Sequence, residues 1–156
     1  MWTFEKITSL LRRRGIAFEE IHFMDDGAVS ARAADTSKNN NYDPDKAIKT
    51  LVVVSGDFLY GVVLRADSRI DSIKLKKLIG KWSVVSLDAL EDLGFVPGGV
   101  NPFVLDFPVF ADAAVLDLPF LSMGAGSRTK GINVSVSEFE KNLDYKVIDI
   151  KENVST

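Results

Sequence analysis

Apolar and polar positions alternate along this chain in short runs that are typical of a protein mixing helices and strands. Near the start, the apolar residues of "FEKITSLLRRR" recur at helical spacing, and Gly15 follows as a helix-ending residue. The strongest strand pattern is "KTLVVVSGDFLYGVVLR", in which two β-branched runs flank Gly56-Asp57 and predict a hairpin. Because these runs are apolar on both faces, we expect both sides of the hairpin to be covered.

The remaining runs predict helices and strands that interleave without a strict βαβ rhythm. Strands are predicted at 18–23, 82–86, 108–116, 120–126, from Gly131, and at 145–150. Helices are predicted after Ser30, at 71–80, at 86–94, and where Ser137 and Glu140 form a capping box. We therefore expect an α+β fold with a mixed, mostly antiparallel, barrel-like sheet surrounded by helices. Residues 1–156 are expected to form one domain whose tail frays from Lys151.

The composition excludes several classes of protein. Of the 156 residues, 46% are hydrophobic and 26% are charged, as in globular proteins. No apolar run approaches the roughly 20 residues that span a bilayer. The arginines follow the first apolar run, which reverses the order of a secretory signal, so we expect a cytoplasmic protein without membrane contact. Because the chain has no cysteine, disulfides, thiolate zinc sites and cysteine nucleophiles are excluded.

Charge and familiar motifs narrow the chemistry further. The net charge of −3 argues against a nucleic-acid-binding protein with an overall basic charge. The clusters Arg12–Arg14 and Lys74–Lys81 are interpreted first as solvated helix faces, with RNA contact as the alternative. The only histidine, His22, lies in a predicted strand, where a structural role is favoured over a Ser-His-Asp triad. "GAGSRTKG" at 124–131 matches no phosphate-loop motif, and we expect neither a metal nor a cofactor.

Two features remain without an ordinary explanation. Lys49 stands immediately before "TLVVV", where its ammonium either reaches back to solvent or points into a cleft at a phosphate or carboxylate. The stretch "LGFVPGGVNPF" at 93–103 combines three glycines with two prolines. Gly98 and Gly99 permit positive φ and close approach, while Pro97 and Pro102 stiffen the flanks. Such a stretch is either a tight structural turn or a loop that binds a ligand.

Four blocks in order resemble one known family. They are "KTLVVV" at 49–54, "GFVPGGVNPF" at 94–103, Asp112 in "VFADAAVL", and "GAGSR" at 124–128, supported by the early "IHF…VSARAA" stretch. With this spacing the chain resembles the YbaK/ProX family of trans-editing aminoacyl-tRNA deacylases, which are related to the editing domain inserted in some bacterial prolyl-tRNA synthetases. The resemblance covers about 18–143 and implies the mixed, barrel-like α+β fold expected above.

The resemblance also implies a site and a reaction. It implies a catalytic role for Lys49 and substrate contacts from Thr50, Gly98, Gly99, Val100, Pro102, Phe103, Asp112, Gly126 and Ser127. The implied reaction is hydrolysis of mischarged aminoacyl-tRNA, with tRNA-Pro carrying alanine or cysteine as the expected substrate. A non-catalytic tRNA- or nucleotide-binding module is the alternative. The expected partners are the acceptor end of aminoacyl-tRNA and a synthetase such as prolyl-tRNA synthetase, with the chain itself a monomer or weak homo-oligomer.

Overall fold

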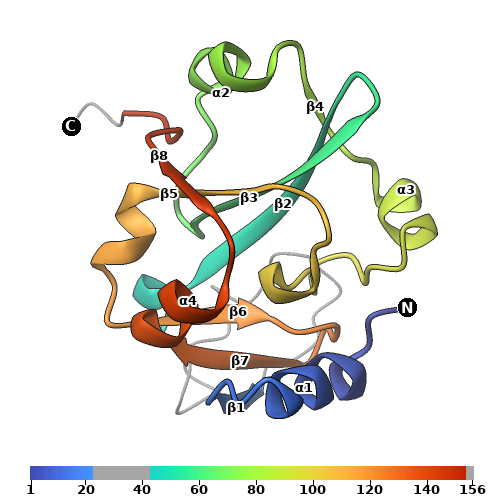
Figure 1. Cartoon of the computed structure of the whole chain (residues 1–156), viewed down its shortest axis with the longest axis vertical. Helices are drawn as coiled ribbons and strands as arrows, with labels where there is room; N and C mark the ends of the chain where they lie inside the picture. Colours follow the sequence, from blue (N-terminus) through green and yellow to red (C-terminus); the bar gives the residue numbers. More distant parts are fainter. Residues whose placement is uncertain (23–42, 154–156) are drawn as a thin grey trace.

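A computed structural model describes residues 1–22 and 43–153 of the chain (Figure 1). Its helices are α1 (Phe4–Arg13), α2 (Ser72–Ile79), α3 (Leu87–Asp92) and α4 (Val136–Asn142). Its strands are β1 (Glu19–His22), β2 (Ile48–Ser55), β3 (Phe58–Arg65), β4 (Ser83–Val84), β5 (Val109–Asp112), β6 (Phe120–Gly124), β7 (Lys130–Ser135) and β8 (Lys146–Ile148). Short 3₁₀ helices occupy Pro44–Lys46, Pro102–Val104 and Ala113–Asp117.

The strands form two sheets. The larger sheet has the order β4-β2-β3-β5-β8, with antiparallel pairing in its β4-β2-β3 part and parallel pairing of β5 with β3 and β8. The smaller sheet, β1-β7-β6, is antiparallel throughout. The predicted α+β class with mostly antiparallel pairing is therefore confirmed. The described strands stay in two separate sheets and do not close into a barrel.

The β2–β3 hairpin is covered on both faces, as its sequence predicted. Val52 belongs to the main core between the two sheets, whereas Val53 belongs to a second cluster with Leu75 of α2 and Ile150. Neighbouring strand residues point to opposite faces, so both neighbours are buried only if both faces are packed. The turn places Gly56 at φ +60°, a conformation that glycine adopts without strain.

Helices and loops close the main core. The apolar face of α1 packs against it through Phe4, Ile7 and Leu11. Figure 1 shows α1 beside the smaller sheet and the 3₁₀ helix Pro102–Val104, in gold, between the two sheets. This arrangement buries the end of the glycine- and proline-rich stretch, residues 99–103, whereas its beginning at Leu93 is exposed. Within the described ranges, none of the helices has the length and apolarity needed to cross a bilayer.

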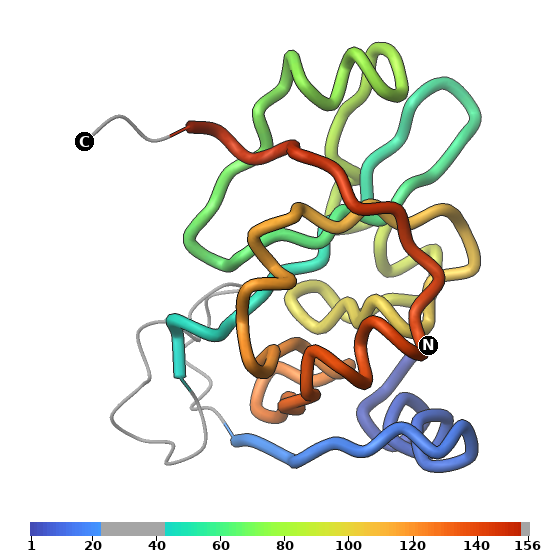
Figure 2. Tube along the Cα trace, turned by 60° about the vertical axis from the view of Figure 1, so that its left-hand side comes forward, coloured from blue at the N-terminus to red at the C-terminus, as the bar shows by residue number. Residues whose placement is uncertain are grey.

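Some local predictions need correction. α4 begins two residues earlier than the predicted capping box, because the Ser135 hydroxyl, and not that of Ser137, caps the helix by accepting the hydrogen bond from the Glu138 amide. Fraying from Lys151 is also wrong, since Lys151 pairs with Ile70 in an antiparallel bridge. Figure 2 shows the end of the described chain, in red, crossing the green segment that precedes α2. The His22 side chain is 66% exposed and lies 3.1 Å from Glu20. The helix predicted after Ser30 lies outside the described residues.

Candidate functional site

The two glycine-rich stretches lie against each other, and we call residues 98–102 and 124–127 the paired loops. The Gly126 amide donates a hydrogen bond of 2.8 Å to the Gly99 carbonyl. A Cβ added to Gly99 would lie 2.9–3.0 Å from backbone atoms of Gly126 and Ser127. Real Cβ atoms are almost never found that close to backbone, so this contact requires glycine. The chain that approaches Gly99 closely is therefore the other loop, and the approach of a substrate to Gly99 stays a prediction.

Two further glycines of the paired loops, Gly98 and Gly126, are required by backbone conformation. Gly98 has φ +79° and Gly126 has φ +76°, both in the left-handed region that disfavours residues with a Cβ. Gly126 is also covered by the backbone of the first helical turn, since a Cβ there would clash with Trp2 and Thr3. The backbone that leads into α1 therefore covers the second loop at Gly126.

Asn101 ties the paired loops together and was missed by the sequence reasoning. Its side chain is fully buried. Its Nδ2 donates to the Gly124 carbonyl at 2.8 Å, while its Oδ1 accepts from the Phe103 amide at 3.0 Å. The pair "NP" carried a signal for the second bond, because asparagine is a preferred N-cap and proline a preferred first helical residue. Nothing local could reveal the first bond.

The apolar residues of the first loop belong to the core. The exposed fractions of Val100 and Phe103 are only 8% and 5%, and Pro102 is buried as well. The Phe103 ring packs edge-on against Phe139 of α4, with 6.3 Å between ring centroids. These side chains therefore support the loop from behind, and their expected contact with substrate stays a prediction.

The second loop ends in a turn that Ser127 organises. The Ser127 hydroxyl accepts hydrogen bonds from the amides of Thr129 and Lys130, at 3.1 and 3.2 Å. Such a turn restrains the chain between β6 and β7. The same hydroxyl also lies 3.2 Å from that of Thr129, and the substrate contact expected for Ser127 stays a prediction.

Lys49 lies partly buried at the start of β2, on the face of the large sheet that carries the second cluster. Burial lowers the pKa of its ammonium, and the charge of Arg69 lowers it further, while Asp67 acts in the opposite direction. A turn closed by the bond from the Ser68 amide to the Arg65 carbonyl returns the chain toward this place. The exposed Arg69 is thus a second cation near Lys49, and no sequence motif had pointed to it.

Thr50 points to the opposite face, toward the main core, because strand neighbours alternate. Its Oγ1 is buried and has no hydrogen-bond partner among the residues described. The start of β2 is connected to the second loop through the parallel bridge between Ala47 and Ser122. Both chains leave this bridge in the same direction, and Lys49 and Gly124 are each two residues beyond it. The backbone at the start of β2 therefore lies beside β6, while the Lys49 and Thr50 side chains point to opposite faces of the large sheet.

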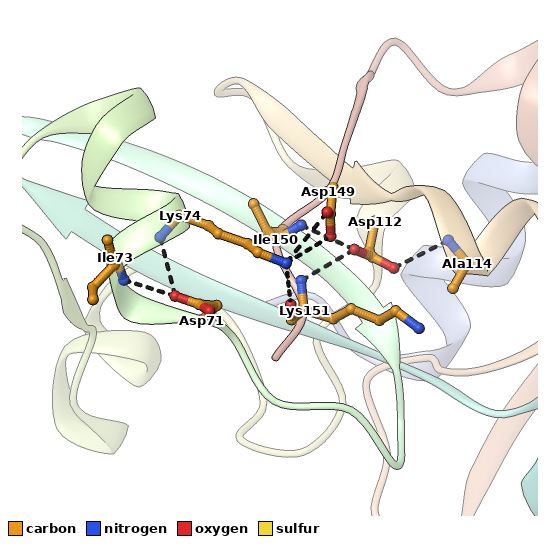
Figure 3. A network of polar contacts seen from close by, with 8 residues as sticks. All are labelled: Asp71, Ile73, Lys74, Asp112, Ala114, Asp149, Ile150 and Lys151. Atoms are coloured by element: carbon orange, nitrogen blue, oxygen red, sulfur yellow. Dashed lines mark hydrogen bonds and ion pairs between the residues drawn. The ribbon is translucent and has the colours of Figure 1, made fainter. Parts of the chain in front are cut away.

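Asp112 has a structural environment (Figure 3). Its side chain is 2% exposed. One carboxylate oxygen accepts from the amides of Ile150 and Lys151 at 3.0 and 3.2 Å, and the other accepts from the Ala114 amide at 3.0 Å. Asp112 thereby pins the C-terminal segment to the end of β5. A direct substrate contact by Asp112 stays a prediction.

The same C-terminal segment contacts the chain around Arg69. Lys151 pairs with Ile70, and the Glu152 amide donates to the Arg69 carbonyl at 2.8 Å. Lys74 of α2 contacts both Asp149 carboxylate oxygens at 3.2 Å, as Figure 3 shows. The backbone of Arg69 is therefore held in place although its side chain is exposed.

The basic clusters are partly occupied by the protein itself. The Arg12 guanidinium lies over the Phe18 ring, 5.2 Å from its centroid, and Arg14 donates to the Asn142 carbonyl at 2.6 Å. Lys74 is engaged as described above. These contacts favour the interpretation as helix faces, and leave exposed cations such as Arg13 as the candidates for RNA contact. Among the described residues, no group of three or more His, Asp or Glu side chains could hold a metal ion.

Comparison with known proteins relates this chain to aminoacyl-tRNA editing domains. A family model described as an aminoacyl-tRNA editing domain matches residues 29–141. The proline–tRNA ligase of Persephonella marina is 33% identical over 115 residues, covering 71% of this chain and 20% of the ligase. That of Coprothermobacter proteolyticus is 23% identical over 139 residues, covering 87% and 24%. The chain thus spans about a quarter or less of these relatives.

A solved structure shows the same fold. It is described as a proposed trans-editing enzyme for prolyl tRNA synthetase, and its TM-score with this chain is 0.81 at 21% sequence identity. The match covers 96% of this chain and 97% of the other. The two-sheet arrangement found here is therefore shared across the full length of another protein.

Proposed function

This chain belongs to the aminoacyl-tRNA editing domain family, and we propose that it hydrolyses the ester bond of mischarged aminoacyl-tRNA. We expect its substrate to be tRNA-Pro carrying a small wrong residue such as alanine or cysteine. The family membership confirms the resemblance noted from the sequence motifs. The reaction and the substrate are our proposal.

The observation that carries the proposal is the position of Lys49. A partly buried ammonium lies beside Arg69 at the start of β2, and Ala47, just before this strand, bridges to Ser122 of β6, the strand that leads into the second glycine-rich loop. An ammonium is a compact point charge with three donors, which suits a phosphate. We assign to Lys49 the phosphate next to the terminal adenosine, because this places the aminoacyl ester toward the paired loops.

The remaining chemistry needs no nucleophilic side chain. An aminoacyl ester is already activated, and the neighbouring ribose hydroxyl is available to assist its hydrolysis. Backbone groups of the paired loops would orient water or stabilise the developing oxyanion, and the Thr50 hydroxyl has spare hydrogen-bonding capacity nearby. Rigid backbone suits this role because its dipoles need no reorganisation during the reaction.

A deacylation screen tests the proposal. Purified tRNAs would each be charged with several amino acids, and ester release would be followed against the spontaneous release in buffer. We expect accelerated release from tRNA-Pro charged with alanine or cysteine and little acceleration from tRNA-Pro charged with proline. Release at the buffer rate for every tRNA would contradict an enzymatic role. Salt-dependent retention of tRNA in that case would support the non-catalytic binding module instead.

A further inference from the structure

The side chain of Asn101 joins the two glycine-rich loops. The loops are far apart in sequence, and most of their contacts are between backbone atoms. Asn101 is the residue of the first loop whose side chain reaches the backbone of the second, through the bond from Nδ2 to the Gly124 carbonyl. Because this side chain has no solvent exposure, neither end of its amide can exchange its partner for water.

The oxygen and the nitrogen of the Asn101 side-chain amide make different hydrogen bonds. Oδ1 caps the 3₁₀ helix by accepting from the Phe103 amide, which is a local interaction that serine or aspartate also provides. Nδ2 supplies the cross-loop hydrogen bond, which needs both a donor and the length of the asparagine side chain. Serine has a donor but is too short. Aspartate has the length, but its ionised carboxylate has no proton to donate to a carbonyl.

The cross-loop bond acts at a point where the loops are tightly packed. A Cβ at Gly124 would lie 3.0 Å from the Gly98 carbonyl oxygen and 3.1 Å from the Gly99 Cα. The Gly126 amide bonds to the Gly99 carbonyl a few residues further on. Contacts at both ends of the pair prevent one loop from sliding or rotating against the other.

We propose that Asn101 is a positioning residue: it joins the paired loops into one rigid unit and thereby sets the orientation of the Gly98–Gly99 backbone toward the aminoacyl ester. The catalytic part of this proposal rests on the proposed function. Asn101 touches neither substrate nor water in this role. It acts through the backbone that it holds, so its loss lowers turnover more than substrate binding.

Two substitutions separate the cross-loop bond from the cap. Asn101→Ser and Asn101→Asp both keep an oxygen that accepts from the Phe103 amide, and both lose the donor to Gly124. Ser86→Ala is the matched control, because the Ser86 hydroxyl caps α3 at the Ala89 amide without contacting the paired loops. The measurements are hydrogen exchange at the Gly126 amide, melting temperature, and kcat and KM for mischarged tRNA.

For both Asn101 variants we expect exchange at the Gly126 amide to become at least about tenfold faster, because its bond to Gly99 opens more often. We expect kcat to fall about 10- to 100-fold, as a small displacement of positioning groups does, while KM stays within about twofold. Ser86→Ala should lower the melting temperature and leave kcat and Gly126 exchange unchanged.

Wild-type kcat together with unchanged Gly126 exchange in both Asn101 variants would overturn the proposal. So would a loss of activity that matches the loss of folded protein. If the wild-type protein hydrolyses no charged tRNA, both the proposed function and the catalytic role of Asn101 are contradicted. Gly126 exchange would then decide by itself whether Asn101 joins the loops.

Discussion

The paired loops and the Lys49 end of the large sheet differ in how they are built. In the loops, uncharged backbone packs against backbone, and the one polar side chain that joins them, Asn101, is fully buried. At the Lys49 end, charged side chains from neighbouring segments lie partly exposed, and the ammonium of Lys49 is disfavoured by burial and by Arg69.

The difference indicates a division of roles. Packed backbone has a fixed geometry, which suits the orientation of a reacting ester but tolerates no added atoms. A partly buried cation costs stability by itself and gains a partner when an anion binds. Changes in the loops should therefore affect folding and turnover together, whereas changes at Lys49 should affect function alone. The following experiments test this contrast, beginning with the largest expected effect.

Lys49→Ala should reduce kcat/KM by about 10- to 100-fold or more, since a hydrogen bond to a charged group contributes about 1.5–3 kcal/mol. The free energy of unfolding should change by less than about 0.5 kcal/mol, because the lost attraction to Asp67 is offset by relief of the burial of the charge and of its repulsion from Arg69. Lys49→Arg should restore little activity, because the broad, planar guanidinium group of arginine does not reproduce the compact charge of the lysine ammonium. Near-wild-type turnover by folded Lys49→Ala protein would remove Lys49 from the site.

Asp112→Asn tests whether Asp112 is structural. Its carboxylate accepts from three backbone amides, and an asparagine NH₂ group would face at least one of them with a second donor. We expect a loss of about 1–3 kcal/mol in the free energy of unfolding, measured by denaturant titration. Asp149→Asn is the matched control, because its ion pair with Lys74 is exposed and should contribute less than about 1 kcal/mol. Equal losses in the two variants would contradict the role given to Asp112.

Gly99→Ala tests the packing of the paired loops. The added methyl group would meet the backbone of the second loop, so we expect a loss of about 1–3 kcal/mol in unfolding free energy. Activity per folded molecule should fall as well. Gly15→Ala provides the comparison, since Gly15 has φ +71° but open space around it, and only the left-handed conformation costs energy there. Full activity of the folded Gly99→Ala protein would show that the loops are scaffold only.

Arg69→Ala tests the electrostatics of the Lys49 end through pH. Anchoring of a phosphate needs protonated Lys49, so binding should weaken as pH rises through the folded-state pKa, which lies below that of an ordinary lysine. Removing Arg69 removes one of the two causes of the lowered pKa, and the fall in binding should move to higher pH. The measurement is binding of a non-hydrolysable aminoacyl-amide analogue of the tRNA 3′ end. Lys76→Ala, on an exposed face of α2, should leave the profile unchanged.

The same lowered pKa has a consequence for stability. The unfolded chain, with an ordinary lysine, binds the Lys49 proton more tightly than the folded protein does. Between the two pKa values the unfolded state therefore carries more protons, and the free energy of unfolding should rise with pH across that window. This rise should be missing in Lys49→Ala. An identical pH dependence in both proteins would show that burial does not perturb Lys49.

The sequence alone determined the features that depend on local interactions. Hydrophobic spacing identified the β2–β3 hairpin with its two covered faces, because burial on both sides leaves few polar positions in the middle of the strands. The order and spacing of "KTLVVV", "GFVPGGVNPF" and "GAGSR" identified the family. The absence of cysteine excluded whole classes of chemistry without any coordinates.

Only the tertiary structure decided which residues meet. Gly99 needs to be glycine because Gly126 lies against it, and Asn101 owes its second bond to Gly124, a residue 23 positions away. The amides that occupy Asp112 come from a C-terminal segment 38 and 39 positions further along the chain. Such contacts are selected when whole elements pack together, since a residue's own neighbours in sequence carry no record of what will lie across the core.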